Sequence, residues 1–217
     1  MRKLNVCLSL LLLCLLAFTS CKKPHNTKSY TLNSQPANNP SEVHIWGNPN
    51  QNLSGVGAPE IGAATWTSGG ATVFMRAALK FDLSAIPADA VITSAKLSLF
   101  SNHTPLNGNQ TDANFGTDNT VLIQQITGAW TPGLVTWDNQ PVAATQNQII
   151  IPSTTSSFGD LTDIDVSVFI KNMVGNNNNN GFLIRLQTEQ IYNSRIFCSS
   201  KYSDASKYPK LVIEYSH

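Results

Sequence analysis

Five cations in this chain stand where they could recognise a carboxylate. Arg76, Lys80, Arg185, Arg195 and Lys201 lie in or beside runs of alternating apolar residues, the pattern of a strand with one buried face. A guanidinium group presents a planar pair of N–H donors that matches the two oxygens of a carboxylate. If Arg76, Lys80 and Arg185 face outward from a sheet, they form a positive patch suited to a uronic acid. The structural alternative is that these arginines tie down neighbouring loops through acids or backbone carbonyls.

Aromatic residues form a second set of candidates, because the apolar face of a sugar ring stacks on an aromatic ring. Trp46, Trp66, Tyr192 and Tyr202 lie near predicted loops. We take Trp46, Trp66 and Tyr202 as candidate ligand contacts. Trp130 and Trp137 have a different expected role, which is to pack beneath the loops as part of the core.

Metal binding and catalysis have weaker signals. Asp160, Asp163 and Asp165 form an acidic cluster that could hold calcium, since hard cations prefer oxygen ligands; capping of a helix explains at least one of them. The glutamates and histidines are scattered, and the sequence has no H-E-x-x-H, G-x-S-x-G or P-loop pattern. We therefore predict no catalytic residue and no cofactor, with calcium as an open alternative. A lyase or hydrolase whose groups are assembled by folding is a further alternative.

Short strands are the elements that must position these side chains. Alternating apolar runs bounded by turn residues predict strands at 29–32, 42–46, 73–81, 91–100, 121–126, 148–151, 182–188, 195–199 and 211–215. Segments rich in Gly, Asn, Thr and Pro predict loops at 47–57, 101–119 and 130–141. Arg185 and Arg195 are expected on the two sides of a hairpin, where they could flank a structural aspartate.

One segment has helical spacing. The apolar positions between 166 and 174 predict a single short helix, capped by Asp163 or Asp165 and ended by Gly175 and the asparagines after it. Together the elements predict an all-β fold, a two-sheet antiparallel β-sandwich of jelly-roll type with one helix near 166–174. A closed β-barrel is the alternative.

The N-terminal segment reads as an export signal. Residues 1–20 hold a basic start, an apolar run too short to span a bilayer, and small residues before Cys21. This arrangement resembles a bacterial lipoprotein box, which implies that Cys21 carries lipid. Residues 21–29 would then be a tether, and 30–217 the domain, held at the outer membrane or the cell surface. An ordinary cleaved signal and an uncleaved anchor are the alternatives.

Composition limits the partners and the redox chemistry. The chain has 14 basic and 13 acidic residues, without the basic excess of a nucleic-acid-binding protein. Cys198 is the one cysteine after Cys21, so the predicted domain has no internal disulfide. Its place in an apolar alternating run favours a small buried side chain over a nucleophile.

Three blocks of the sequence resemble one family. They are RAALKFDLSAIP at 76–87, GAWTPGLVTWDNQP at 128–141, and 181–215 from GFLIRL through SRIFCSSKYSDASKYPKLVIEY. The blocks resemble the recurring motifs of DNRLRE-domain proteins, also known as the family 96 carbohydrate-binding modules. Departures occur at Asn180 and Cys198, where the family usually has Tyr, and at Lys201, where it usually has Glu.

The resemblance implies a sandwich from exported, often polysaccharide-degrading systems, with alginate-like acidic glycans as ligands. We therefore expect a cell-envelope lipoprotein with a non-catalytic carbohydrate-binding module for an acidic polysaccharide such as alginate. The alternatives are a structural or adhesive envelope protein that contacts other proteins, and a polysaccharide lyase or hydrolase.

Overall fold

The computed structural model describes residues 28–35, 41–48, 51–55, 57–106 and 111–217. The predicted signal at 1–20, the lipidation position Cys21 and the tether up to residue 27 lie outside the described residues. Within the described ranges, no helix has both the length and the apolar content needed to cross a bilayer.

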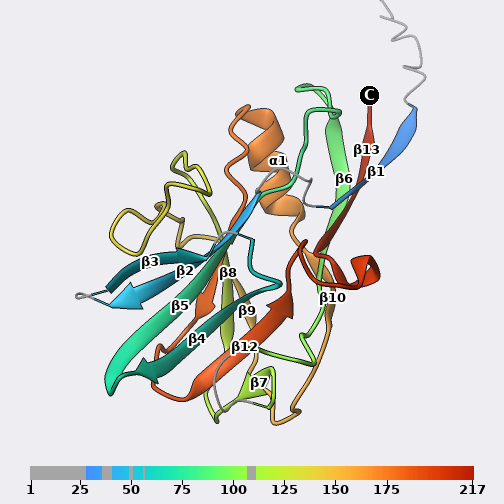
Figure 1. Cartoon of the computed structure of the whole chain (residues 1–217). Coiled ribbons are helices and arrows are strands. Elements are labelled where there is room, and N and C mark those ends of the chain that lie inside the picture. The colour runs from blue at the N-terminus through green and yellow to red at the C-terminus, as the bar shows by residue number, and fades with distance from the viewer. Residues whose placement is uncertain (1–27, 36–40, 49–50, 56, 107–110) are drawn as a thin grey trace, which may run out of the picture.

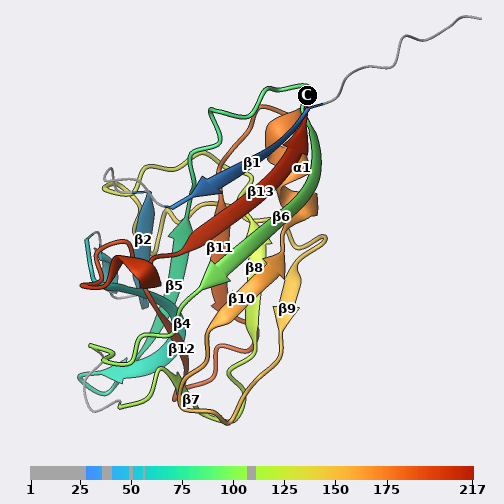
Figure 2. The same ribbon diagram turned by 90° about the vertical axis from the view of Figure 1, so that its right-hand side faces the viewer.

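One of the two antiparallel sheets has four strands that lie side by side in Figure 2. In spatial order they are β1 (Ser29–Ser34), β13 (Lys210–Ser216), β6 (Val91–Leu99) and β10 (Leu161–Asp165). The two ends of the described chain meet here, because Ser29 pairs with Ser216 across the first two strands. We call this the small sheet.

The other sheet has nine strands and curves into a half-barrel. Seven follow the spatial order β7 (Asn114–Phe115), β12 (Asn193–Cys198), β4 (Glu60–Ser68), β5 (Ala71–Leu79), β11 (Phe182–Leu186), β8 (Val121–Gln125) and β9 (Ile149–Ile151). β2 (Glu42–Asn48) pairs with β5 and with β3 (Gln51–Gly55). We call this the large sheet (Figure 1).

The large sheet forks at β5. β2 pairs with this strand from Phe74 to Leu79. β4 pairs with it from Ala71 to Met75, and β11 pairs with it from Ala77 to Leu79. A strand has only two edges for hydrogen bonding, so β4 and β11 must share the edge opposite β2. Arg76 therefore lies at the branch point between them.

The main core lies between the two sheets and includes the helix α1 (Ser167–Gly175). Its largest fully buried side chains include Phe169, Phe182, Phe197, Leu97 and Ile123. A second apolar cluster lies on the opposite face of β2, β5 and β11, where Val43, Ile45, Ala78 and Leu183 are buried against Val135 and Ile126. Trp130 and Trp137 pack on this second cluster, which confirms the core role predicted for them.

The predicted all-β sandwich with one short helix is confirmed, and no closed barrel forms from the described strands. The helix begins one residue later than predicted, at Ser167. The N-cap residue is Val166, and no side chain caps this end of the helix, so the predicted cap by Asp163 or Asp165 was wrong. Asp165 lies just before the N-cap and accepts hydrogen bonds from the Ser167 N–H and hydroxyl groups at 3.0 and 2.6 Å. These hydrogen bonds, with Lys96 beside them, lower the pKa of Asp165 to about 2.

Several sequence predictions were wrong. The predicted loops 47–57 and 101–119 contain the strands β3 and β7. β4 and β10 were not predicted as strands at all. β11 and β12 do not form a hairpin, since β11 pairs with β5 and β8, whereas β12 pairs with β4 and β7. Arg185 and Arg195 are consequently not neighbours across a turn.

Candidate functional site

Two of the predicted cations converge on one surface pocket, which we call the arginine pocket. It has a volume of about 520 Å³, within the range of small-ligand sites. Its lining residues come from three strands of the large sheet and from the loop after β8: Arg76, Gln124, Gln140, Pro141, Val142, Ala143, Thr145, Leu183 and Arg185.

The ladder between β5 and β11 brings the two arginines together. Ile184 pairs with Ala77, so the next step along the antiparallel register sets Arg185 beside Arg76. Alternate residues of a strand face opposite sides of the sheet. Both arginines therefore lie on the face of the second apolar cluster, away from the small sheet. The start of β11 requires a glycine, because Gly181 has φ +76° and an added Cβ would lie 2.1 Å from the Leu79 carbonyl oxygen.

Arg76 is held by partners on every side. Its Nε and Nη2 atoms each donate to a different carboxylate oxygen of Glu189 at 2.7 Å, and its Nη1 donates to Gln140 Oε1 at 2.7 Å. The guanidinium also lies 4.6 Å from the centre of the Trp137 ring, within range of a cation–π contact. Arg76 therefore has a structural role, the alternative considered from the sequence: it ties the loop after β8 to the segment after β11.

Arg185 has weaker partners. Its Nε donates to Gln124 Oε1 at 3.1 Å and its Nη1 to the Leu186 carbonyl at 2.9 Å, so neither bond uses Nη2. No acid in the described ranges lies within 4 Å of its nitrogens. Burial lowers the pKa of Arg185; nearby Glu189 raises it, and Arg76 lowers it further. With two guanidinium groups and one carboxylate, this part of the pocket has an excess of one positive charge.

The other predicted contacts lie outside the arginine pocket. Lys80 lies 5.7 Å from the centre of the Trp130 ring, whose indole N–H donates to the Asn180 carbonyl. Lys201 is exposed; burial raises the pKa of Glu42, and the positive charge of Lys201 offsets a small part of that rise. Tyr202 is half-buried in the turn after β12, where its N–H donates to the Ser199 carbonyl.

Arg195 lies in the interior of the protein. It is 3% exposed, and its Nη1 donates to the Pro152 carbonyl at 3.2 Å. Its Nε is buried and has no hydrogen-bond partner among the described residues. Burial lowers its pKa. Arg195 therefore does not face the pocket that holds Arg76 and Arg185.

An aromatic cluster lies at the end of the large sheet where β4, β7 and β12 meet. The Trp66 ring makes edge-to-face contacts with Phe115 at 5.4 Å and Tyr192 at 5.0 Å between ring centres. Phe115 and Tyr192 are 42% and 50% exposed. Sequence reasoning named Trp66 and placed Tyr192 near a loop, but it missed Phe115, which stands in a segment without periodicity.

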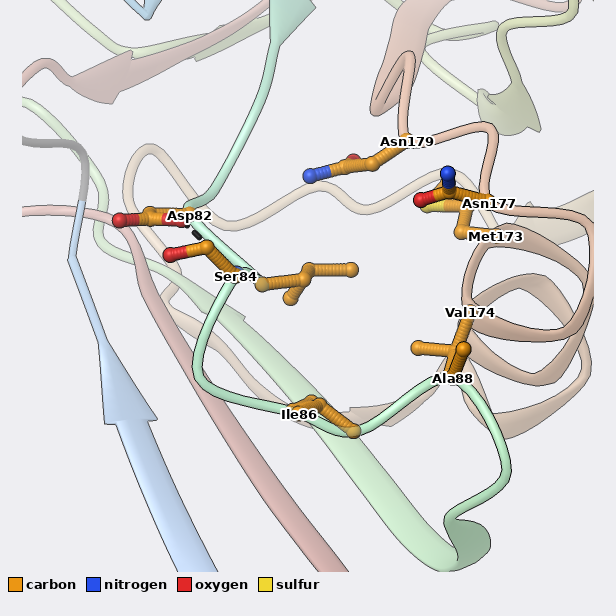
Figure 3. Close-up of a pocket in the computed structure, with 9 residues that line it drawn as sticks. Asp82, Ser84, Ile86, Ala88, Met173, Val174, Asn177 and Asn179 are labelled. Carbon is orange, nitrogen blue, oxygen red and sulfur yellow. Dashed lines mark hydrogen bonds between the residues drawn. The ribbon is translucent and has the colours of Figure 1, made fainter.

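Another hollow lies between the loop after β5 and α1, and Figure 3 shows its lining side chains. Its lining includes the buried apolar residues Leu83, Ile86, Met173 and Val174. Asn177 and Asn179, which follow the helix, also line it (Figure 3). Its charged group is Asp82, whose pKa is lowered by hydrogen bonds from Ser84. A pocket whose charge is an anion is less suited to an acidic ligand than the arginine pocket.

The three candidate calcium ligands, Asp160, Asp163 and Asp165, do not form a common binding site. Asp160 accepts from the Ser101 N–H and pairs with Lys207, and Asp165 binds Ser167 and Lys96. Asp163 lies at an irregularity of the ladder between β10 and β6, with φ +56°. No group of three acidic, histidine or cysteine side chains suited to a metal ion is found in the described ranges.

Cys198 is 1% exposed, and burial is the main cause that raises its pKa to about 11. A thiol with this pKa is protonated at neutral pH and is a poor nucleophile. This agrees with the expected role as a small buried side chain.

Comparison with known proteins identifies one family. The family model for carbohydrate-binding module family 96 matches residues 64–215, which include both arginines of the arginine pocket. No curated protein matches the chain.

Proposed function

Because the chain belongs to carbohydrate-binding module family 96, we propose that it binds an acidic polysaccharide such as alginate at the arginine pocket, without catalysis. One observation carries this proposal: Arg185 stands beside Arg76 in a pocket with excess positive charge. Arg76 is occupied by Glu189, so Arg185 is the group proposed to contact a carboxylate of the ligand. The half-buried amide of Gln140, which also lines the pocket, would form a hydrogen bond with a sugar hydroxyl group.

The direct test is electrophoresis of the protein through gels that contain alginate. The unaltered protein should be retarded, and Arg185→Gln should weaken the binding about tenfold, since a charge-assisted hydrogen bond in a partly buried site is lost. Lys210→Gln is the matched control, because Lys210 is an exposed cation of the small sheet. Equal effects of the two substitutions, or no retardation by alginate, would refute the proposal.

The absence of catalysis is tested separately. Incubation of the protein with alginate or pectin should release no new reducing ends and no unsaturated products. Product formation at a rate typical of enzymes would favour the lyase or hydrolase alternative.

We also propose that Cys21 is lipidated and holds the domain at the outer membrane or the cell surface. The support is the sequence of residues 1–21. Cys21→Ser should move the protein from the membrane fraction to the soluble fraction. Unchanged membrane association of this variant would contradict the lipid anchor.

A further inference from the structure

A second pocket opens on the other face of the large sheet. We call it the Trp46 pocket; it has a volume of about 230 Å³ and is lined by His44, Trp46, Gly55, Ala58, Glu60, Met75 and Leu106. Met75 and Arg76 are consecutive residues of β5, so their side chains point to opposite faces of the strand. The Trp46 pocket and the arginine pocket are therefore separate sites on one strand.

The geometry points to the Trp46 pocket as a binding site for a single uncharged sugar ring. This inference rests on the proposed function for the class of ligand, a carbohydrate. It adds a second site, with a different preference for charge, to the one that holds Arg76 and Arg185.

His44 gives the first reason. It is 5% exposed, and its Nε2 atom is buried without a hydrogen-bond partner among the described residues. A buried polar atom without a partner costs about 1–3 kcal/mol. Burial lowers the pKa of His44 to about 4, so the imidazole is neutral at pH 7 and offers one donor and one acceptor nitrogen. A hydroxyl group of a bound sugar would provide the missing partner.

Glu60 gives the second reason. It is 4% exposed, and its Oε2 accepts hydrogen bonds from Asn102 Nδ2 at 2.8 Å and from the Leu106 N–H at 3.0 Å. These bonds fix the carboxyl group before any ligand arrives, and neither of them uses Oε1. An acceptor that is already oriented loses little entropy when a ligand binds. Glu60 Oε1 is therefore placed to accept from a second sugar hydroxyl group.

Trp46 and the apolar lining give the third reason. The indole is half-buried on the lining of the pocket, with Met75 and Leu106 as apolar neighbours. An aromatic wall beside a few fixed polar atoms suits a sugar ring, which has C–H faces and hydroxyl edges. Gly55 leaves the space open, since an added Cβ would lie 3.3 Å from the Cβ of His44.

Charge and size select among sugars. No cation is among the described residues that line this pocket, and its ionisable groups are the neutral His44 and the carboxyl group of Glu60. Burial raises the pKa of Glu60, but the ionised fraction still repels a uronate. The volume is less than half that of the arginine pocket. One uncharged ring, at a chain end or on a branch, is the ligand that fits.

The test is an NMR titration of the full-length protein with methyl glycosides of glucose, galactose, mannose, xylose and N-acetylglucosamine. At least one of them should shift the Trp46 indole signal saturably, and the methyl glycoside of glucuronic acid should bind at least tenfold more weakly. Failure of all five, or equal binding of the glucuronide, would overturn the inference.

Two substitutions separate this site from a structural effect. His44→Phe keeps a ring of similar size, so the protein should fold, and it should weaken the glycoside shift at least tenfold. Glu60→Gln keeps an acceptor for Asn102 and Leu106 and should bring the glucuronide affinity closer to that of the neutral glycosides. An unchanged titration in His44→Phe would refute the inference.

Arg185→Gln distinguishes the two proposals. It should weaken alginate binding about tenfold and leave the glycoside titration unchanged. Glycoside binding without alginate binding in the unaltered protein would refute only the ligand proposed for the arginine pocket. Alginate binding without any glycoside shift would refute only the Trp46 pocket.

Discussion

Arg76 and Glu189 lie 113 residues apart and form a two-pronged ion pair, with both N–O distances at 2.7 Å. The pair lies at the fork of the large sheet, and its side chains are about one-fifth exposed. Its neighbour Arg185 has no such partner in the described ranges. The two arginines therefore have different roles: Arg76 fixes the pocket wall, and Arg185 is the cation proposed to meet the ligand.

The first prediction concerns the ion pair. Glu189→Gln removes the negative charge beside both arginines, so alginate binding should tighten roughly fivefold, equivalent to about 1 kcal/mol. The fold should lose about 1 kcal/mol of stability, because a charge-assisted pair becomes a neutral hydrogen bond. Affinity electrophoresis and urea unfolding measure the two effects. Glu214→Gln, an exposed acid on the small sheet, should change neither. Weaker alginate binding by Glu189→Gln would contradict this account.

The second prediction concerns the buried guanidinium of Arg195. Arg195→Met should keep or raise the thermal stability, because a desolvated cation without a paired acid in the described ranges is replaced by an apolar chain of similar length. Alginate retention should stay within twofold of the unaltered protein. A stability loss of more than about 2 kcal/mol would show that the cation is well compensated.

The third prediction concerns pH. The pKa of His44 is about 4 in the folded protein and near 6.5 when unfolded. A group with a lowered folded pKa contributes stability above pH 6.5 and loses it as the pH falls towards 4. Glu42 and Glu60, whose pKa values are raised by burial, have the opposite sign, because they stabilise the fold as they become protonated.

The comparison with His44→Phe isolates the histidine. From pH 7 to pH 4.5, this variant should gain about 2–3 kcal/mol of stability relative to the unaltered protein. Urea unfolding at the two pH values measures the difference. Parallel pH profiles of the two proteins would contradict the buried, neutral state of His44.

The fourth prediction concerns the start of β11. Gly181→Ala should destabilise the fold by more than about 3 kcal/mol, since a Cβ at this position would lie 2.1 Å from the Leu79 carbonyl oxygen and the residue has φ +76°. Gly175→Ala is the control, because a Cβ there meets no atom within 4 Å. The thermal denaturation midpoints of the two variants should differ by more than about 6 °C; similar midpoints would be inconsistent with the close packing of β11 on β5.

Sequence patterns predicted the strands whose apolar residues recur at every second position. β5, β6 and β11 alternate in this way, and the alternation places Arg76 and Arg185 on the face opposite the main core, although that face also packs against the second apolar cluster. The pairing of Ile184 with Ala77 then sets the two arginines side by side. β4 gave no such signal: its first six residues are all buried and are mostly small. A strand covered on both sides has no polar face to reveal its period.

The Trp46 pocket could not be predicted for a related reason. His44 and Glu60 are polar residues in strands, where the pattern alone assigns polar residues to solvent. Both are at least 95% buried, because residues from separate strands and Leu106, from the loop after β6, surround them. The burial of Arg195 was missed in the same way. The burial of His44, Glu60 and Arg195 depends on tertiary packing, which the spacing of apolar residues along one strand does not reveal.

The fork at β5 also affects the order in which the strands of the large sheet can pair during folding. One edge of this strand is filled by its immediate neighbour β4 and by β11, which follows about a hundred residues later. Until β11 has been synthesised, the part of this edge from Ala77 to Leu79 has no partner strand. Completion of this edge therefore depends on contacts between segments far apart in the sequence, and such contacts slow folding.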